Sequence, residues 1–177
     1  VFGFNEIMTG CGLIGPHAAC SMRGGVFWMG TGNFFVLAGG GPRSIPCTVW
    51  DVVFQNLDSD NQTKCVAAPN SAFDEVFFFY PSLSGGTGEI DSYVKFNIEE
   101  NSWDYGTLSR TAWTDQSVLG QPIGTTPTGI IYQHETSPDA DGGALLASYI
   151  TGWFVVSESR DFMFVDWLFP DMKWRYF

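Results

Sequence analysis

The sequence predicts an all-β protein made of short antiparallel strands. Its 177 residues include 16 Phe, 7 Trp and 6 Tyr, which favour strands, and 21 Gly and 9 Pro, which favour the tight turns between strands. Good helix formers are scarce, and only three residues are Lys. Composition therefore excludes an all-α fold.

The N-terminal third predicts two strands, an open loop and one short helix. The two strands are separated by a tight glycine turn, and the run Gly39–Gly41 predicts an open connection. This run is not followed by the Lys of a phosphate-binding loop, so no nucleotide site is expected. Thr48 and Asp51 form a weak capping pair before apolar residues at helical spacing. The predicted strands are Gly24–Gly30 and Gly32–Leu37, and the predicted helix covers 48–57.

Between Lys64 and Leu108 the apolar pattern takes on a period of two, which predicts four successive antiparallel strands. The second is apolar on both faces, as expected for a sheet sandwiched between neighbours. Across the last hairpin, Trp103 is predicted to be buried against Phe96. The strands are Lys64–Ala68, Glu75–Tyr80, Tyr93–Ile98 and Trp103–Gly106, with turns at Pro69–Ala72 and Glu99–Ser102.

The same arrangement is predicted to recur towards the C-terminus, with strands at Ile130–Tyr132, Trp153–Val156 and Phe162–Phe169. Phe35, Phe78 and Tyr132 lie 43 and 54 residues apart on apolar strands. Self-similarity at about 40 to 50 residues, with four strands to the unit, is typical of propeller blades. The pattern Tyr93–Asn97 followed by Asn101–Trp103 resembles the third and fourth strands of a kelch-like blade. A β-sandwich or jelly roll would use similar strands without predicting the recurrence.

We therefore expect residues 1–177 to form a single propeller-like β region with one short helix. Val1–Glu6 shows neither a starting Met nor the features of a signal peptide, and Lys173–Phe177 ends within a predicted strand without a polar tail, so we expect part of a longer polypeptide. The longest apolar runs are about five residues, whereas a membrane span needs roughly 20, so no membrane partner is expected.

Charge argues against a polyanionic partner. The chain carries 8 Lys and Arg against 19 Asp and Glu, a formal net charge of -11. Binding of nucleic acid through phosphate contacts is therefore disfavoured.

The sequence predicts no catalytic, cofactor-binding or metal-binding residue set. His134 and Glu135 could form a catalytic or metal pair, although a hydrogen-bonded structural His beside an exposed Glu is commoner. Asp139 and Asp141 come closest to a calcium loop but lack further ligands at the expected offsets. The other histidine, His17, has no evident partner. Two further carboxylate pairs could be weighed as the acid and base of a glycosidase, namely Asp58 with Asp60 and Glu99 with Glu100. Each pair lies in a polar turn, where exposure to solvent is the simpler explanation for its charge.

The four cysteines have neither zinc-site nor redox-motif spacing. Buried free thiols are the favoured interpretation, and one or two disulfides are the alternative. The cysteines are Cys11, Cys20, Cys47 and Cys65.

A series of structural segments carries a resemblance to one protein family. These segments are Leu13–His17, Val26–Gly30, Ile45–Asp51, Phe73–Val76, Tyr80–Ser82, Tyr93–Asn97, Trp103–Gly106, Arg110–Trp113, Ile131–Glu135 and Phe169–Asp171. In them the chain resembles the large virion proteins of tailed bacteriophages that are described as packaged-DNA stabilisation, tail hub or nozzle proteins.

The resemblance implies a β-propeller-containing subunit in a ring of about six copies, located in the virion at the tail or head-to-tail junction. Such a ring would contact the portal or adaptor and other tail proteins, close the DNA channel after packaging and conduct DNA at ejection without binding it specifically. The acidic charge agrees with such a conduit. A tail-fibre or capsid protein is an alternative within the same class. The competing classes are a carbohydrate-binding propeller, suggested by the Trp and Tyr content, and a propeller enzyme.

Overall fold

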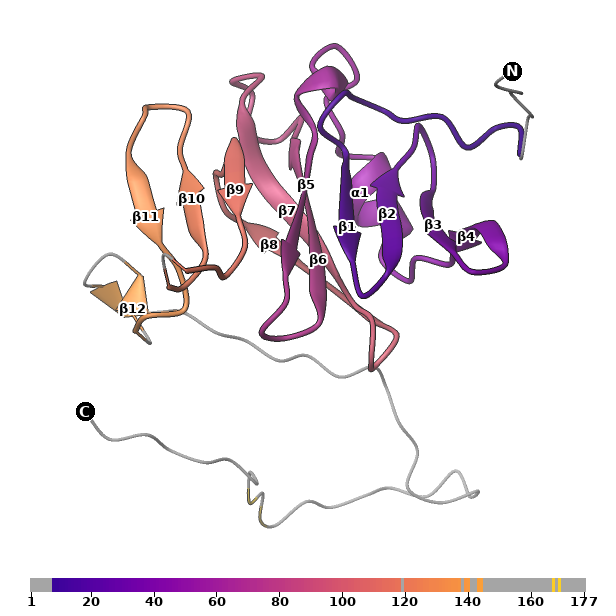
Figure 1. Cartoon of the computed structure of the whole chain (residues 1–177). Coiled ribbons are helices and arrows are strands. Elements are labelled where there is room, and N and C mark those ends of the chain that lie inside the picture. Colours follow the sequence, from indigo (N-terminus) through magenta and orange to yellow (C-terminus); the bar gives the residue numbers. More distant parts are fainter. Residues whose placement is uncertain are drawn as a thin grey trace, which may run out of the picture.

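Antiparallel sheets dominate the computed structural model, which describes residues 8–118, 120–137, 139–140, 143–144, 167 and 169. Two sheets have four strands, one has three and one has two, and within each sheet the strands follow in chain order. Figure 1 shows the three larger sheets side by side, with the second between the first and the third. The all-β prediction is confirmed.

The first sheet contains β1 (Ala19–Met22), β2 (Gly25–Met29), β3 (Phe34–Ala38) and β4 (Gly41–Ile45). The two strands predicted here correspond to β2 and β3. The glycine run at 39–41 is not an open loop, because its first two residues form a tight turn and Gly41, at φ +108°, begins β4.

Helix α1 spans only Trp50–Phe54, so the predicted extent of 48–57 is wrong at both ends. Its N-cap is Val49, and no side chain caps it, so the predicted pair of Thr48 and Asp51 does not form. The sequence offers β-branched residues with weak helix propensity here, and Leu57 instead forms a β-bridge with Ser82. A 3-10 turn, η1, follows at Gln62–Lys64.

The second sheet confirms the four predicted strands as β5 (Val66–Asn70), β6 (Glu75–Pro81), β7 (Ile90–Asn97) and β8 (Ser102–Thr107). Strand β5 extends through Pro69, which was predicted to begin a turn. Pro69 is tolerated because β5 is the edge strand of its sheet.

Strand β6 is buried on both faces and separates two hydrophobic cores. Val76 and Phe78 point into the first core, which the first sheet and α1 share with the second sheet. Phe77 and Phe79 point into the second core, where Trp113 from the third sheet packs on both rings. Neighbours on both sides therefore explain why this strand is apolar on both faces.

Trp103 packs on Phe96 across the β7–β8 hairpin, as predicted, with ring centroids 4.8 Å apart. It is half-buried rather than buried. Its ring also contacts Phe34 and Phe78, and its indole N–H donates to the carbonyl of Pro46 at 2.8 Å. Trp103 thus fastens the outer strand of the second sheet to the first sheet.

The third sheet contains β9 (Ala112–Thr114), β10 (Ile123–Thr125) and β11 (Ile131–Gln133), and a two-stranded ladder follows at β12 (Asp139–Ala140) and β13 (Gly143–Ala144). Strand β11 confirms the strand predicted at Ile130–Tyr132. The strand predicted at Trp153–Val156 lies outside the described residues. Of Phe162–Phe169, only Trp167 and Phe169 are described, and neither is in a strand.

The first strands of the three sheets recur at a regular interval and touch one another. They begin at Ala19, Val66 and Ala112, 47 and 46 residues apart. Strand β1 contacts β5, where the Ala67 N–H donates to the His17 carbonyl at 2.8 Å, and β5 contacts β9. The predicted repeat length is therefore of the right size.

The aromatic residues used to find that repeat are nevertheless not equivalent. Phe35 and Tyr132 lie on the third strands of their sheets, whereas Phe78 lies on a second strand. No closed barrel or propeller forms within the described residues. None of the helices described has the length and apolar character needed to cross a membrane.

Candidate functional site

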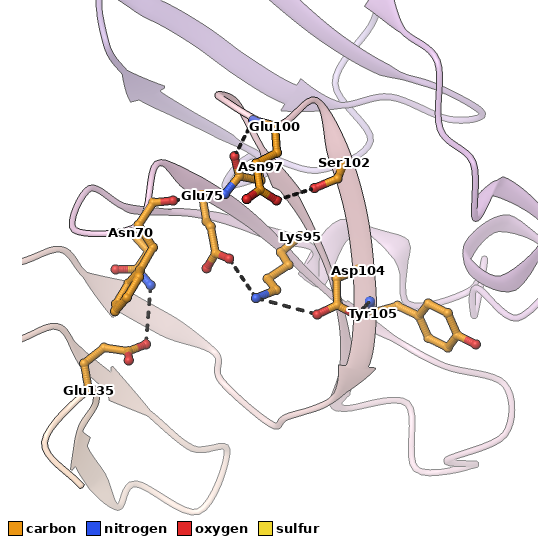
Figure 2. Close-up of polar contacts among 10 residues, drawn as sticks. Asn70, Glu75, Lys95, Asn97, Glu100, Ser102, Asp104, Tyr105 and Glu135 are labelled. Carbon is orange, nitrogen blue, oxygen red and sulfur yellow. Dashed lines mark hydrogen bonds and ion pairs between the residues drawn. The ribbon is translucent and has the colours of Figure 1, made fainter. Parts of the chain in front are cut away.

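Polar side chains gather on one face of the second sheet because the strand register places them in rows. Asn70, Glu75, Asn97 and Ser102 are successive partners across the four strands, so their side chains share a face. The next row on that face contains Lys95 and Asp104 beside Phe77. Figure 2 shows the polar side chains of both rows together. We call this set the polar face.

Lys95 is the electrostatic centre of the polar face. Its Nζ lies 2.7 Å from Glu75 Oε1 and 3.6 Å from Asp104 Oδ2, and it stands 5.9 Å from the centroid of the Phe77 ring. Burial alone would lower the pKa of Lys95, but the hydrogen bond and charge of Glu75, aided by Asp104, raise it above its ordinary value. The ammonium is therefore held charged and cannot act as a base at neutral pH.

A hollow of about 150 Å³ opens over this network. Three carboxylates and one ammonium line it, so its net charge is negative, and the lining groups could hydrogen-bond a hydroxylated ligand. The lining residues are Glu75, Lys95, Asn97, Glu100, Ser102 and Asp104.

Asn70 lies at the buried end of the polar row. Its side-chain amide donates to Glu135 Oε1 at 3.4 Å, whereas its Oδ1 is buried and has no hydrogen-bond partner. Next to it, the N–H of Ser71 donates to Asp115 Oδ1 at 3.1 Å. On the other side, Asp74 forms an ion pair with Arg23. The β5–β6 turn is thereby joined by polar contacts to both neighbouring sheets.

His134 belongs to a different, structural cluster inside the third sheet. Its Nε2 accepts a hydrogen bond from Nε of the buried Arg110 at 2.8 Å, and its ring packs on Trp113 at 4.6 Å. The guanidinium of Arg110 also lies over the Tyr132 ring at 4.5 Å. Gly124 makes room for this cluster, because a Cβ there would lie 2.8 Å from Arg110 Cδ.

The structure therefore separates the candidate pair of His134 and Glu135. Glu135 adopts a left-handed backbone conformation, at φ +58°, and its exposed side chain meets Asn70 rather than the histidine. The interpretation of a hydrogen-bonded His beside an exposed Glu is confirmed. His17 lies at the junction of the first and second sheets, not in this cluster.

The other candidate carboxylates serve local turns. Asp58 accepts hydrogen bonds from the Asp60 N–H at 3.1 Å and from the Asn61 amide at 2.8 Å. Glu100 accepts from the Ser102 hydroxyl at 3.4 Å within the β7–β8 turn, which also contains Glu99. Asp139 lies in β12. Its proposed calcium-binding partner, Asp141, lies outside the described residues.

All four cysteines are free thiols. Only Cys65 is fully buried, so the expectation of buried thiols holds for one residue and partly for the others. Burial raises the pKa of Cys65 and of Cys20 to about 12 and that of Cys47 to about 11. These thiols therefore stay protonated and unreactive at neutral pH.

Sequence reasoning missed two polar contacts, that of Lys95 with Asp104 and that of Arg110 with His134. The contact of Lys95 with Asp104 could have been predicted from the sequence, because a register that sets Phe96 opposite Trp103 also sets Lys95 opposite Asp104. The contact of Arg110 with His134 could not have been predicted in this way, because it depends on β9 and β11 lying on either side of β10.

Among the described residues, no group of three His, Cys, Asp or Glu side chains is placed to hold a metal ion. Comparison with models of known protein families finds no match, and comparison with curated proteins finds none either.

Proposed function

We propose that this protein is a structural component of a bacteriophage virion, located at the tail or head-to-tail junction. It forms a ring of about six copies that closes the DNA channel and conducts DNA at ejection. The observation that carries this proposal is the regular succession of antiparallel sheets, whose first strands begin 47 and 46 residues apart and contact one another. Stacking of this kind supports kelch-like propeller blades, which the resemblance to virion proteins also implies.

The polar contacts support action by assembly rather than by a chemical step. Lys95 is paired with carboxylates, His134 accepts from Arg110, and the Asp58 carboxylate caps its own turn. Each of these groups is engaged in holding strands or turns together. The expected partners are copies of the chain, the portal or adaptor, and other tail proteins.

The test is the mass of the purified protein, with electron microscopy of the particles. A particle of about six copies supports the ring, and each subunit contact should bury at least about 1,000 Å². A monomer at tens of micromolar, or a measurable turnover abolished by His134→Ala, contradicts it.

The acidic charge of -11 provides a second test, because a DNA conduit should not retain DNA. We expect no mobility shift of double-stranded DNA even at low salt. A variant with several added Lys on the channel wall should bind DNA with an affinity that falls steeply with salt. Salt-sensitive binding by the parent protein would refute the conduit.

A carbohydrate-binding propeller is the second candidate, favoured by an exposed aromatic ring on the second sheet. Tyr105 is 51 % exposed on β8, on the face opposite to Asp104. A glycan array with the parent protein and with Tyr105→Ala distinguishes the candidates. Binding that this substitution abolishes would favour the sugar-binding function, and an empty array with a ring-shaped particle would favour the virion ring.

A further inference from the structure

The third sheet has one covered and one uncovered face. On the covered face, Trp113, Gly124 and Tyr132 are register partners, and Trp113 packs against the second sheet. The alternate residues point the other way, and we call them the outer face of the third sheet. They are Ala112, Thr114, Ile123, Thr125, Ile131 and Gln133.

The outer face exposes apolar side chains. On this face Ile131 is 68 % exposed, and Ala112 is exposed as well. By contrast, strand β6 of the second sheet is covered on both of its faces. A sheet face that carries β-branched apolar residues is normally packed against another layer of structure. The outer face therefore lacks a layer.

The part of the chain that follows β13 is a candidate for that missing layer. After Ala144, 33 residues follow, and they include the apolar runs Trp153–Val156 and Phe162–Val165. Trp167 and Phe169, which are described, are 76 % and 83 % exposed, and their rings stack on each other at 6.2 Å. Aromatic residues and an apolar sheet face, both exposed to water, are complementary in chemistry.

The repeat length points to the same segment. The first strands of the sheets start 46 to 47 residues apart, so the next start is due near residue 158, between the two apolar runs. An extended chain covers about 3.3 Å per residue, so a segment of this length can return over a three-stranded sheet.

We propose that the outer face of the third sheet is a docking surface, and that its occupant is the segment of this same chain that follows β13. The segment covers Ile131 and its neighbours as the first and third sheets cover the second. This inference does not depend on the proposed virion function.

Hydrogen exchange of the full chain, followed by mass spectrometry, tests the proposal. In the parent protein, amides of residues 153–169 should exchange at least about tenfold more slowly than in an unstructured peptide. Ile131→Asp should abolish this protection. Val118→Asp is the matched control, because Val118 is fully exposed in the β9–β10 connection and lies off the outer face. This control should behave as the parent does.

Exchange in β6 reports whether each variant is folded. If Ile131→Asp also exposes β6, the milder Ile131→Thr is judged by the same criterion. The proposal is overturned if residues 153–169 are unprotected in the parent, or if Ile131 variants leave their protection unchanged. It is also overturned if the protection disappears on dilution, because the occupant would then be a second copy.

Discussion

Trp103 provides the sharpest test of the packing between the first two sheets. Replacing it with Ala removes ring contacts with Phe34, Phe78 and Phe96 and the hydrogen bond to the Pro46 carbonyl. Truncating a buried aromatic residue costs about 3 to 5 kcal/mol, and a hydrogen bond contributes about 1 kcal/mol. Because Trp103 is only half-buried, we expect a loss of about 3 kcal/mol.

Urea unfolding monitored by circular dichroism measures this loss through the shift in midpoint at constant slope. Trp103→Phe should lose about 1 kcal/mol, since it keeps a ring and loses the N–H donor. Tyr105→Ala is the matched control, because Tyr105 lies on the same face of β8 and is exposed. It should change stability by no more than about 0.5 kcal/mol. If Trp103→Ala unfolds within that margin of the parent, the packing argument is wrong.

Three further predictions concern ionisable groups and are measured by urea unfolding. Lys95→Met should cost about 2 kcal/mol at pH 7, because it leaves the mostly buried Glu75 without its cation. Since the folded-state pKa of Lys95 is raised above the ordinary 10.5, the stability that the pair contributes is complete below pH 10.5 and is lost as pH rises through the folded-state value. This loss should be absent from Lys95→Met. For Cys65, the folded-state pKa of about 12 against an ordinary 9.0 means that the unfolded thiol ionises first, so stability should fall above about pH 9. Cys65→Ala should reduce that slope, and an unchanged slope would contradict the buried thiol. His134→Ala should cost about 1 to 3 kcal/mol by removing the acceptor of the buried Arg110. His134→Gln can still accept and should cost less; equal losses would show that the hydrogen bond contributes little.

The second sheet could be predicted from sequence because its signals agree with one another. Strand β7 alternates cleanly, and a polar turn places Phe96 opposite Trp103. Strands β4 and β9 could not be found in this way. The residues Gly41–Ile45 include Gly, Pro and Ser, which have low strand propensity, and Ala112–Thr114 is too short to establish a period. Tertiary pairing with neighbouring strands decides both.

The polar contacts at the candidate sites likewise fall into those that the sequence could predict and those that it could not. Contacts within one hairpin, such as Lys95 with Asp104, follow from register alone. The roles of Arg110 and His134 depend on Gly124, whose missing side chain lets both groups meet over β10. No local pattern in the sequence indicates that the glycine makes this space. Sequence reasoning therefore favoured a structural role for His134 without identifying Arg110 as its hydrogen-bond partner.

The two cores on either side of β6 have a consequence for how the protein unfolds. Each core is shared by only two of the three larger sheets, so the described chain behaves as a one-dimensional array with nearest-neighbour coupling. Loss of the third sheet would remove the second core and leave the first intact. Loss of β6 would remove both cores at once. We therefore expect the most slowly exchanging amides to lie in β6, with protection decreasing towards the two outer sheets.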